Sequence, residues 1–397
     1  MRQRVVIIGI GYTSRLCLIQ SVAQIGCEVV VVTLENNDKP PIDSYSKYVS
    51  EVINFPQRNG SDQLAHMLVE RCTSPEGKAI LIPNSDFSVA AIDTHHDILQ
   101  PHFHLPHIHH KEGAIVEWMD KERQKALAAQ LGMKVVNSTN IDIVDGVYHI
   151  PQGMRYPCFT KTRAYTPGNK TTLYRCNDEN ELRQALDEMA GRLHTLTVMV
   201  EDFKEIETEY AVLGFSDGEH VVIPGIIEMI QMTEGKDKGV AMYGKVTPTS
   251  HLQHLIDQFA TFVQTIGLVG LFDIDFYLSD GEYYFDELNL RTGGSCAAIT
   301  KMGVNLPGML VKSLRNESIA DMPSAVTSTA TFANERTCTE SWSDGYLPSK
   351  DFLHILRHSD IRFLDDPDDP MPGKVFHRQL RVMRAKRCIK NMLRWVR

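Results

Sequence analysis

Acidic and amide side chains recur at alternate positions in one stretch of the chain, Gly267 to Ser295. Asp273 and Asp275 lie in a first apolar run, and Glu287 and Asn289 lie in a second. Residues two apart in a strand share a face. Carboxylate and amide oxygens are the ligands that Mg²⁺ prefers in proteins. The stretch therefore predicts a β-hairpin that binds a divalent cation, Mg²⁺ or Mn²⁺.

The loop between the two runs decides whether their acids share a face. A two-residue loop opposes Asp275 to Asp286 and sends Glu287 to the other side of the hairpin. A three-residue loop, a type I turn followed by a glycine bulge, opposes Asp273 to Glu287, so that the polar side chains converge. The predicted metal site needs the three-residue loop.

The residues that follow the second run suit an anion. Arg291 continues the face of Asn289, and the backbone N–H groups of Gly293, Gly294 and Ser295 can bind an oxyanion. A solvated hairpin with ordinary surface acids is the alternative. The regular alternation of the polar side chains with apolar ones argues against it.

The run from Phe272 to Phe276, a turn with Gly281, and the run from Phe285 to Arg291 resemble the metal-binding hairpin of the ATP-grasp superfamily. Enzymes of this superfamily use ATP to activate a carboxylate and join it to an amine, a thiol or a related nucleophile. The resemblance implies metal ligation by Asp275, Glu287 and Asn289, and phosphate binding by Arg291.

Two lysines extend the resemblance towards the N-terminus. Lys121 follows Asp120 at the start of a predicted helix, and Lys161 ends an apolar strand that begins near Tyr156. The resemblance implies that both lysines bind the phosphates of ATP. As alternatives, Lys121 belongs to a capped surface helix and Lys161 to a solvated strand end. The loop 162–172, which covers the phosphates in the superfamily, departs from the glycine-rich pattern and holds only Gly168.

The stretch after Thr197 resembles the adenine hinge of the superfamily. The resemblance implies that Glu201, Asp202 and Phe203 hold the adenine edge and that Glu209 binds the ribose. Glu207 is the alternative for the ribose.

The N-terminal region predicts a parallel α/β sheet. Strands at 4–9 and 27–33 flank a helix at 14–25, which is a βαβ unit. A further strand at 79–83 is followed by Ser85 and Asp86. Because ligands bind at the carboxyl ends of parallel strands, both residues are candidates for a substrate site. The alternative is that one of them caps the following helix.

Composition limits the classes of protein that fit. A chain of 397 residues suits two or three domains. We expect an α/β domain at 1–112, a two-lobed α+β ATP-grasp domain at 113–322 and an extension at 323–397. The net charge of −9 argues against a general nucleic-acid binder. Eight cysteines without paired spacing, no transmembrane run and no signal peptide favour a cytoplasmic protein with reduced thiols.

Five other segments give weaker signals. The histidine-rich segment 102–110 lacks accompanying acids, so we interpret it as structural rather than metal-binding. Irregular structure is predicted for three segments, which are residues 228–243, the surroundings of Trp342 and residues 365–370. The basic segment 378–397 predicts an amphipathic helix that contacts an anionic membrane, or a helix packed on the body, which we favour.

The resemblance implies an ATP-dependent ligase that forms an acyl phosphate and passes the acyl group to an amine. Its cofactors are ATP and Mg²⁺ or Mn²⁺, and its partners are a small carboxylate, an amine and, as a homodimer, a second copy. The resemblance to the branch of the superfamily that contains D-aspartate ligase is looser than the resemblance to the superfamily as a whole. The alternatives are a bicarbonate-using carboxylase or carbamoyl-phosphate-type phosphotransferase, and a non-catalytic nucleotide-binding regulator.

Overall fold

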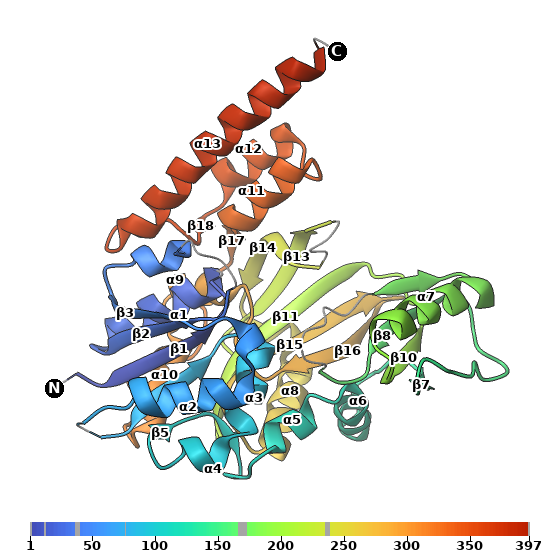
Figure 1. Ribbon diagram of the computed structural model, residues 1–397, viewed down its shortest axis with the longest axis horizontal. Helices are drawn as coiled ribbons and strands as arrows, with labels where there is room; N and C mark the ends of the chain where they lie inside the picture. Colours follow the sequence, from blue (N-terminus) through green and yellow to red (C-terminus); the bar gives the residue numbers. More distant parts are fainter. Residues whose placement is uncertain are drawn as a thin grey trace. The chain divides into compact units, whose positions relative to one another are not determined.

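The computed structural model describes residues 2–11, 13–35, 40–75, 77–165, 173–234 and 239–395, with side-chain surroundings as far as residue 383. Figure 1 shows the chain, which divides into two compact units. Unit 1 comprises Met1–Ile115, Tyr210–Asp273 and Asn289–Arg397, and unit 2 comprises Val116–Glu209 and Ile274–Leu288. The predicted three-domain bounds stay a prediction, whereas the mixed α/β class with a parallel N-terminal sheet is confirmed.

Unit 1 begins with a parallel sheet of order β3-β2-β1-β4-β5. Its strands are β1 (Arg4–Gly9), β2 (Glu28–Thr33), β3 (Val49–Asn54), β4 (Ala79–Pro83) and β5 (Phe103–His104). Val5 and Ile7 pack into one apolar cluster with helix α1, and Val6 and Ile8 pack into another with helix α2. Both faces are therefore buried, which explains the continuous apolar runs and confirms the predicted βαβ unit.

Five helices and two short 3₁₀ turns accompany this sheet. They are α1 (Thr13–Gln24), α2 (Ser61–Arg71), α3 (Asp86–Asp93), α4 (His96–Leu99), α5 (Ala114–Trp118), and the turns Ile42–Tyr45 and Gln57–Asn59.

A second sheet has the order β16-β15-β11-β13-β14-β17-β18, with β12 paired to β11 and β6 paired to β15. Its strands are β6 (His107–Ile108), β11 (Thr208–Asp217), β12 (Val221–Val222), β13 (Ile226–Met232), β14 (Ala241–Thr247), β15 (Leu268–Ser279), β16 (Glu282–Asn289), β17 (Ala330–Ala333) and β18 (Ile361–Arg362). The expectation of irregular structure at 228–243 is wrong, because most of β13 lies there. Glu228 opposes Lys245 on β14, and their side chains form an ion pair of 2.7 Å.

The remaining helices of unit 1 follow β14 in sequence. They are α8 (Gln253–Ile266), α9 (Cys296–Lys301), α10 (Leu306–Leu314), α11 (Glu335–Asp344), α12 (Ser349–His358) and α13 (Pro370–Trp395), with a 3₁₀ turn at Thr249–Leu252. Trp342 lies in α11 and stacks on Phe352 of α12 with 5.2 Å between ring centroids, so its predicted place in a loop is wrong. The segment around Trp342 is helical because α11 buries its apolar face against α12.

The C-terminal extension is held to the N-terminal part of unit 1. Leu16 of α1 shares an apolar cluster with Trp342 and Phe376. The buried carboxylate of Asp369 accepts hydrogen bonds from Gln20 Nε2 at 3.1 Å and from the backbone N–H of Lys47 at 3.0 Å. The acidic loop at 365–370 is therefore an anchor.

Glu335 also joins parts of the extension. It is the first residue of α11, and its side chain is 4% exposed. Its carboxylate accepts hydrogen bonds from the backbone N–H groups of Phe363 at 2.7 Å and Leu364 at 3.2 Å.

Unit 2 is built on an antiparallel sheet of order β7-β10-β8-β9. Its strands are β7 (Ser138–Ile143), β8 (Cys158–Thr162), β9 (Tyr174–Cys176) and β10 (Leu196–Asp202), and its long helices are α6 (Lys121–Gln130) and α7 (Glu179–Arg192). The apolar face of α7 covers the sheet, with Leu182 and Leu186 fully buried. The other part of unit 2 is the tip of the β15–β16 hairpin.

The hairpin loop has two residues, Asp280 and Gly281, with φ angles of 52° and 71°. Positive φ at both central positions is the signature of a type I′ turn. Tyr277 and Tyr284, which oppose each other in this register, stack with ring centroids 5.6 Å apart. Of the two loop lengths that the sequence left open, the structure has the shorter one, so the three-residue loop that the predicted metal site needed is not present. Aspartate is one of the residues that most often adopt the left-handed conformation seen at Asp280.

Candidate functional site

Helix α6 places Lys121 beside the hairpin. Asp120 caps the helix by accepting hydrogen bonds from the backbone N–H groups of Glu122 at 2.9 Å and Arg123 at 3.2 Å. Lys121 follows at the first helical position, and its ammonium group forms an ion pair with the Glu287 carboxylate. The cap proposed as an alternative is present, and the lysine nevertheless faces the predicted metal hairpin.

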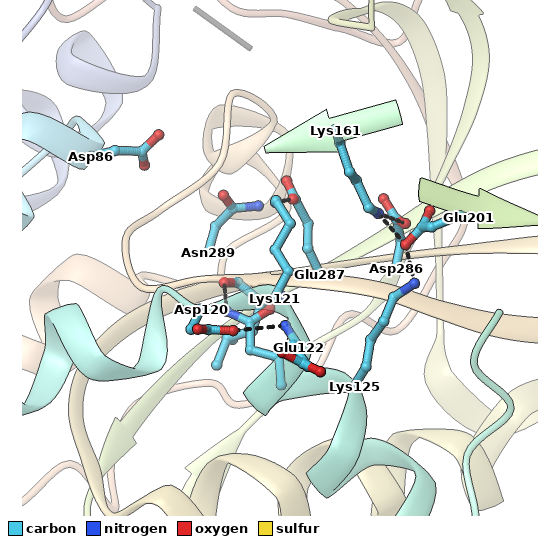
Figure 2. Close-up of polar contacts among 12 residues, drawn as sticks. Asp86, Asp120, Lys121, Glu122, Lys125, Lys161, Glu201, Asp286, Glu287 and Asn289 are labelled. Atoms are coloured by element: carbon cyan, nitrogen blue, oxygen red, sulfur yellow. Dashed lines mark hydrogen bonds and ion pairs between the residues drawn. The ribbon is translucent and has the colours of Figure 1, made fainter. Parts of the chain in front are cut away.

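Lys161 lies at the centre of a buried charge network (Figure 2). It projects from β8, is 5% exposed, and pairs with Asp286 Oδ1 at 2.8 Å and Glu201 Oε1 at 3.1 Å. Lys125, one turn after Lys121 on α6, also contacts Glu201. The alternative of a solvated strand end is wrong for Lys161, because its ammonium group is buried among carboxylates.

Burial and the neighbouring carboxylates have opposite effects on the pKa values of Lys125 and Lys161. Burial alone lowers the pKa of Lys161, but Asp286 and Glu201 outweigh burial and raise it. For Lys125, burial and the charge of Lys161 lower the pKa, and Glu201 offsets only part of this effect. Lys161 thus keeps a full positive charge in a buried position, which suits the binding of an anionic group.

The return strand of the hairpin is irregular. The backbone N–H of Phe285 donates to the Lys134 carbonyl, and the N–H of Leu288 donates to Gln124 Oε1 at 2.8 Å. The Leu288 carbonyl accepts from Gln124 Nε2 at 2.9 Å. Groups on one edge of a regular strand recur every second residue, whereas these two residues are three apart. We infer a β-bulge between Phe285 and Leu288.

The bulge changes the consequence of the two-residue loop. In a regular strand Asp275 would oppose Asp286, and Glu287 would lie on the other face. One extra residue re-aims the side chains that follow it, so the alternation of a regular strand does not extend to Glu287 and Asn289. Asp286 and Glu287 each have an ammonium partner. Burial raises the pKa of Asp286, but Lys161, together with Lys121 and Lys125, lowers it below its ordinary value. The metal roles of Asp275, Glu287 and Asn289 stay predictions.

The predicted adenine hinge ends β10. The backbone N–H groups of Asp202 and Phe203 donate to the carbonyls of Asn137 and Pro157, each at 3.0 Å. The Glu201 carboxylate points towards Lys125 and Lys161 in Figure 2, so its side chain is engaged by these lysines. Any adenine contact by Glu201 would therefore come from its backbone.

Both ribose candidates lie at the start of β11 or just before it. Glu207 Oε1 accepts the backbone N–H of Gly281 at 3.2 Å, in the turn of the hairpin. Glu209, which is half-buried, lies in β11 two residues later. Both glutamates remain candidates for the ribose, and that role stays a prediction.

Unit 1 contains the remaining predicted residues. Arg291 Nε pairs with Asp86 Oδ1 at 2.7 Å, and Arg291 Nη2 donates to Asn289 Oδ1 at 3.3 Å. Ser85 caps α3 in a capping box with Ser88, so the helix-cap alternative is confirmed for this residue. The structure thus brings Asp86, Asn289 and Arg291 together, and it gives the hydroxyl of Ser85 a local partner.

The loop after Arg291 is closely packed at Gly293. A Cβ atom at Gly293 would lie 2.1 Å from Asp273 Oδ2, so this position has no room for a side chain. Asp273 is buried, which raises its pKa to about 6, while Arg291 lowers it. Gly294 has open space around it, and Ser295 is the residue before α9. Oxyanion binding by Gly293, Gly294 and Ser295 stays a prediction.

Two members of the charge network, Lys125 and Asp286, were not predicted from the sequence. Lys125 repeats the position of Lys121 one helical turn later, which is a signal that places it on the same face. Asp286 lies where a regular strand with a three-residue loop would turn its side chain away from the site. The two-residue loop and the bulge place it against Lys161.

The other candidate features give no second site. His107 and His110 stack with ring centroids 3.5 Å apart, and burial lowers the pKa of His107 to about 4. Within the described ranges, no group of three or more His, Cys, Asp or Glu side chains can hold a metal ion. None of the helices described is long and apolar enough to cross a membrane. Membrane contact by the basic helix stays a prediction, because its side chains beyond residue 383 lie outside the described residues.

Comparison with known proteins identifies the domain that carries the charge network. Residues 126–299 match the model of the ATP-grasp domain. The carbamoyl phosphate synthase large chains of Gemmatimonas aurantiaca and Vibrio cholerae are 25% and 24% identical to this chain over 206 and 199 residues. These matches cover 51% and 50% of this chain but only 19% and 18% of the relatives. Residues 126–299 are therefore similar to an ATP-grasp domain, in agreement with the resemblance.

Solved structures show the same fold over most of the chain. An L-amino acid ligase from Bacillus licheniformis has a TM-score of 0.62 at 15% identity, with 83% of this chain and 80% of the other covered. An N5-carboxyaminoimidazole synthetase from Staphylococcus aureus, in complex with ADP, has a TM-score of 0.61 at 16% identity, with 84% and 83% covered. This chain thus shares its fold with these two enzymes over most of its length, beyond residues 126–299.

Proposed function

We propose that the protein is an ATP-dependent ligase that activates a carboxylate as an acyl phosphate and joins it to an amine, releasing ADP and phosphate. The observation that carries the proposal is the set of buried and partly buried ion pairs in unit 2, in which Lys121 and Lys161 are held by Glu287, Asp286 and Glu201. They lie within or next to the segment that matches the ATP-grasp domain.

The charges of the reactants explain why such a site needs these residues. A carboxylate that attacks the γ-phosphate of ATP meets strong electrostatic repulsion. In the proposal, Lys121, Lys161 and Arg291 offset it and stabilise the transferring phosphoryl group. The carboxylate oxygen bonds to the γ-phosphorus and ADP leaves; the amine then attacks the acyl carbon and phosphate leaves. No covalent enzyme intermediate is required.

The residue types of the hairpin fit a hard cation. Asp275, Glu287 and Asn289 offer oxygen donors, but two carboxylates and an amide do not make an all-protein cage. Mg²⁺ is commonly bound through one or two carboxylates together with the phosphates of a substrate. When bound with ATP, the cation would neutralise charge on the phosphate oxygens.

The substrate carboxylate and amine are proposed to be small molecules, with an amino acid as the carboxylate. Arg291, held by Asp86 in unit 1, and the loop at Gly293, Gly294 and Ser295 are proposed to bind the carboxylate or the acyl phosphate. Glu209 is proposed to bind the ribose and the hinge at 201–203 the adenine. A homodimer and a cytoplasmic location remain predictions.

A second candidate is chemistry on bicarbonate. It is favoured by the carbamoyl phosphate synthase relatives and by a structural neighbour, the biotin carboxylase domain of a Hydrogenobacter thermophilus carboxylase, whose structure holds MgADP and bicarbonate. That neighbour has a TM-score of 0.62 at 16% identity, which shows the fold alone.

Release of ADP and phosphate separates these candidates. The protein, ATP and Mg²⁺ are incubated with pairs of amino acids, or with bicarbonate and an amine, and the products are identified by mass spectrometry. A ligase gives ADP release that depends on an amino-acid pair and a product with one new amide bond. Release that depends only on bicarbonate would favour the second candidate, and no release with any pair or with bicarbonate would count against both.

A further inference from the structure

Lys125 is the buried cation of unit 2 for which the resemblance gave no role. It lies on α6 one turn after Lys121, and only 5% of the residue is exposed. Its ammonium group contacts Glu201 at the end of β10, and Figure 2 shows it approaching this carboxylate from the side opposite Lys161. Burying a charged lysine side chain costs free energy unless the charge is paired. Lys125 is therefore not an ordinary solvated surface lysine, and its pairing with Glu201 needs an explanation.

The network is electrically balanced. Two ammonium groups, Lys125 and Lys161, face two carboxylates, Glu201 and Asp286. Glu201 has both lysines as partners and is 6% exposed, whereas the side chain of Asp286 is 35% exposed. If Lys161 binds a phosphate oxygen, Asp286 can be compensated by water, but Glu201 cannot.

Removing one partner of a buried ion pair leaves an uncompensated charge and is strongly unfavourable. If Lys161 were the only partner of Glu201, every phosphate contact made by Lys161 would weaken that pair. With Lys125 in place, Glu201 keeps one ammonium partner throughout. The ammonium group of Lys125 contacts Glu201, and its stem is fixed in α6.

We propose that Lys125 is a positioning residue that keeps Glu201 compensated and thereby frees Lys161 to bind the phosphates of ATP. The inference rests on the proposed function, because it assumes that Lys161 meets a nucleotide. The superfamily resemblance implied that Lys121 and Lys161 bind phosphates. Lys125 is a further residue of the site, and it acts through Glu201.

Calorimetric titration of the full chain with MgATP tests the proposal. Lys125→Met should weaken ATP binding by about 10- to 100-fold, since a buried carboxylate then competes with phosphate for Lys161. Lys125→Arg should retain most of the affinity. Lys125→Met combined with Glu201→Gln should recover much of it, because the amide carries no charge to compensate.

Two controls separate this mechanism from other effects. Lys134→Met removes an exposed lysine paired with Glu282 and should leave the affinity within about twofold. Lys161→Met should weaken binding, and Glu201→Gln should not rescue it, because the phosphate-binding cation itself is lost. Circular dichroism of each variant checks that it is folded.

The outcomes distinguish failure of the inference from failure of the proposed function. If the wild-type protein does not bind MgATP, the proposed function fails and the inference falls with it. If the wild type binds and Lys125→Met binds equally well, only the inference is overturned. If Glu201→Gln fails to restore binding to a folded Lys125→Met protein, Lys125 acts on the fold rather than through Glu201, and the inference is also overturned.

Discussion

Glu335 makes the stability of the C-terminal extension depend on pH. Its carboxyl group is buried beside the backbone N–H groups of Phe363 and Leu364. Burial raises its pKa from 4.5 to about 7, although the hydrogen bonds from the backbone favour the charged form. The native state therefore binds a proton that the unfolded state releases between pH 4.5 and 7.

The sign and size of the effect follow from proton linkage. Because the native state binds more protons in this interval, the free energy of unfolding falls as the pH rises and levels off above pH 7. The shift from 4.5 to about 7 corresponds to ~3 kcal/mol, since each unit of pKa is worth about 1.4 kcal/mol. Glu335→Gln should remove this loss, because glutamine does not titrate.

The assay is urea unfolding at several pH values between 5 and 8, followed by the fluorescence of Trp342. Trp118 and Trp395 are replaced by phenylalanine in all proteins, so that the signal comes from α11. Glu340→Gln on the same helix is the control, because its side chain is 54% exposed and the change of charge is the same. Equal pH slopes for wild type and Glu335→Gln would show that the backbone hydrogen bonds hold Glu335 ionised and would refute the reasoning.

Two further predictions concern the hairpin and the anchor of the extension. Glu287→Gln should lower the rate of phosphoryl transfer by orders of magnitude but weaken adenine-nucleotide binding much less, because it removes the negative charge that pairs with Lys121. ADP release measures the rate, and calorimetry measures nucleotide binding. Glu282→Gln at the exposed end of the hairpin is its control, and wild-type turnover of Glu287→Gln would contradict the site. Asp369→Ala should lower the free energy of unfolding by about 1–3 kcal/mol, because two donors lose their acceptor. The exposed Asp368→Ala should change it little, and equal losses for the two variants would rule out the anchor.

The parallel sheet could be predicted because local patterns determine it. The three predicted strands, β1, β2 and β4, are short runs rich in valine, isoleucine or leucine, and α1 has apolar residues on several sides because most of its residues are buried. Strand β3 reads VSEVIN, lacks this pattern and was not predicted. Glycine after the helix and polar residues after β4 mark the ends of the elements. These signals need no knowledge of distant parts of the chain.

The hairpin geometry and β13 could not be predicted in the same way. Asp280 fits both a two-residue and a three-residue loop, and the choice becomes visible only in the φ angles and the Tyr277–Tyr284 stack. The bulge depends on Gln124, which binds the backbone of Leu288 from a residue 164 positions earlier in the chain. In β13, Glu228 reads as a loop residue until Lys245 is seen to oppose it.

The apolar cluster between α1 and the extension has a consequence for synthesis of the protein. Leu16 leaves the ribosome long before the residues that cover it, which include Trp342 and Phe376. At about 5–20 residues per second, translation reaches Phe376 roughly 20–70 s after Leu16. During this interval the nascent N-terminal sheet exposes one side of α1, and a chaperone that binds apolar segments has time to reach it. Ribosome-bound chains stopped before residue 335 should therefore be better chaperone clients than the released protein.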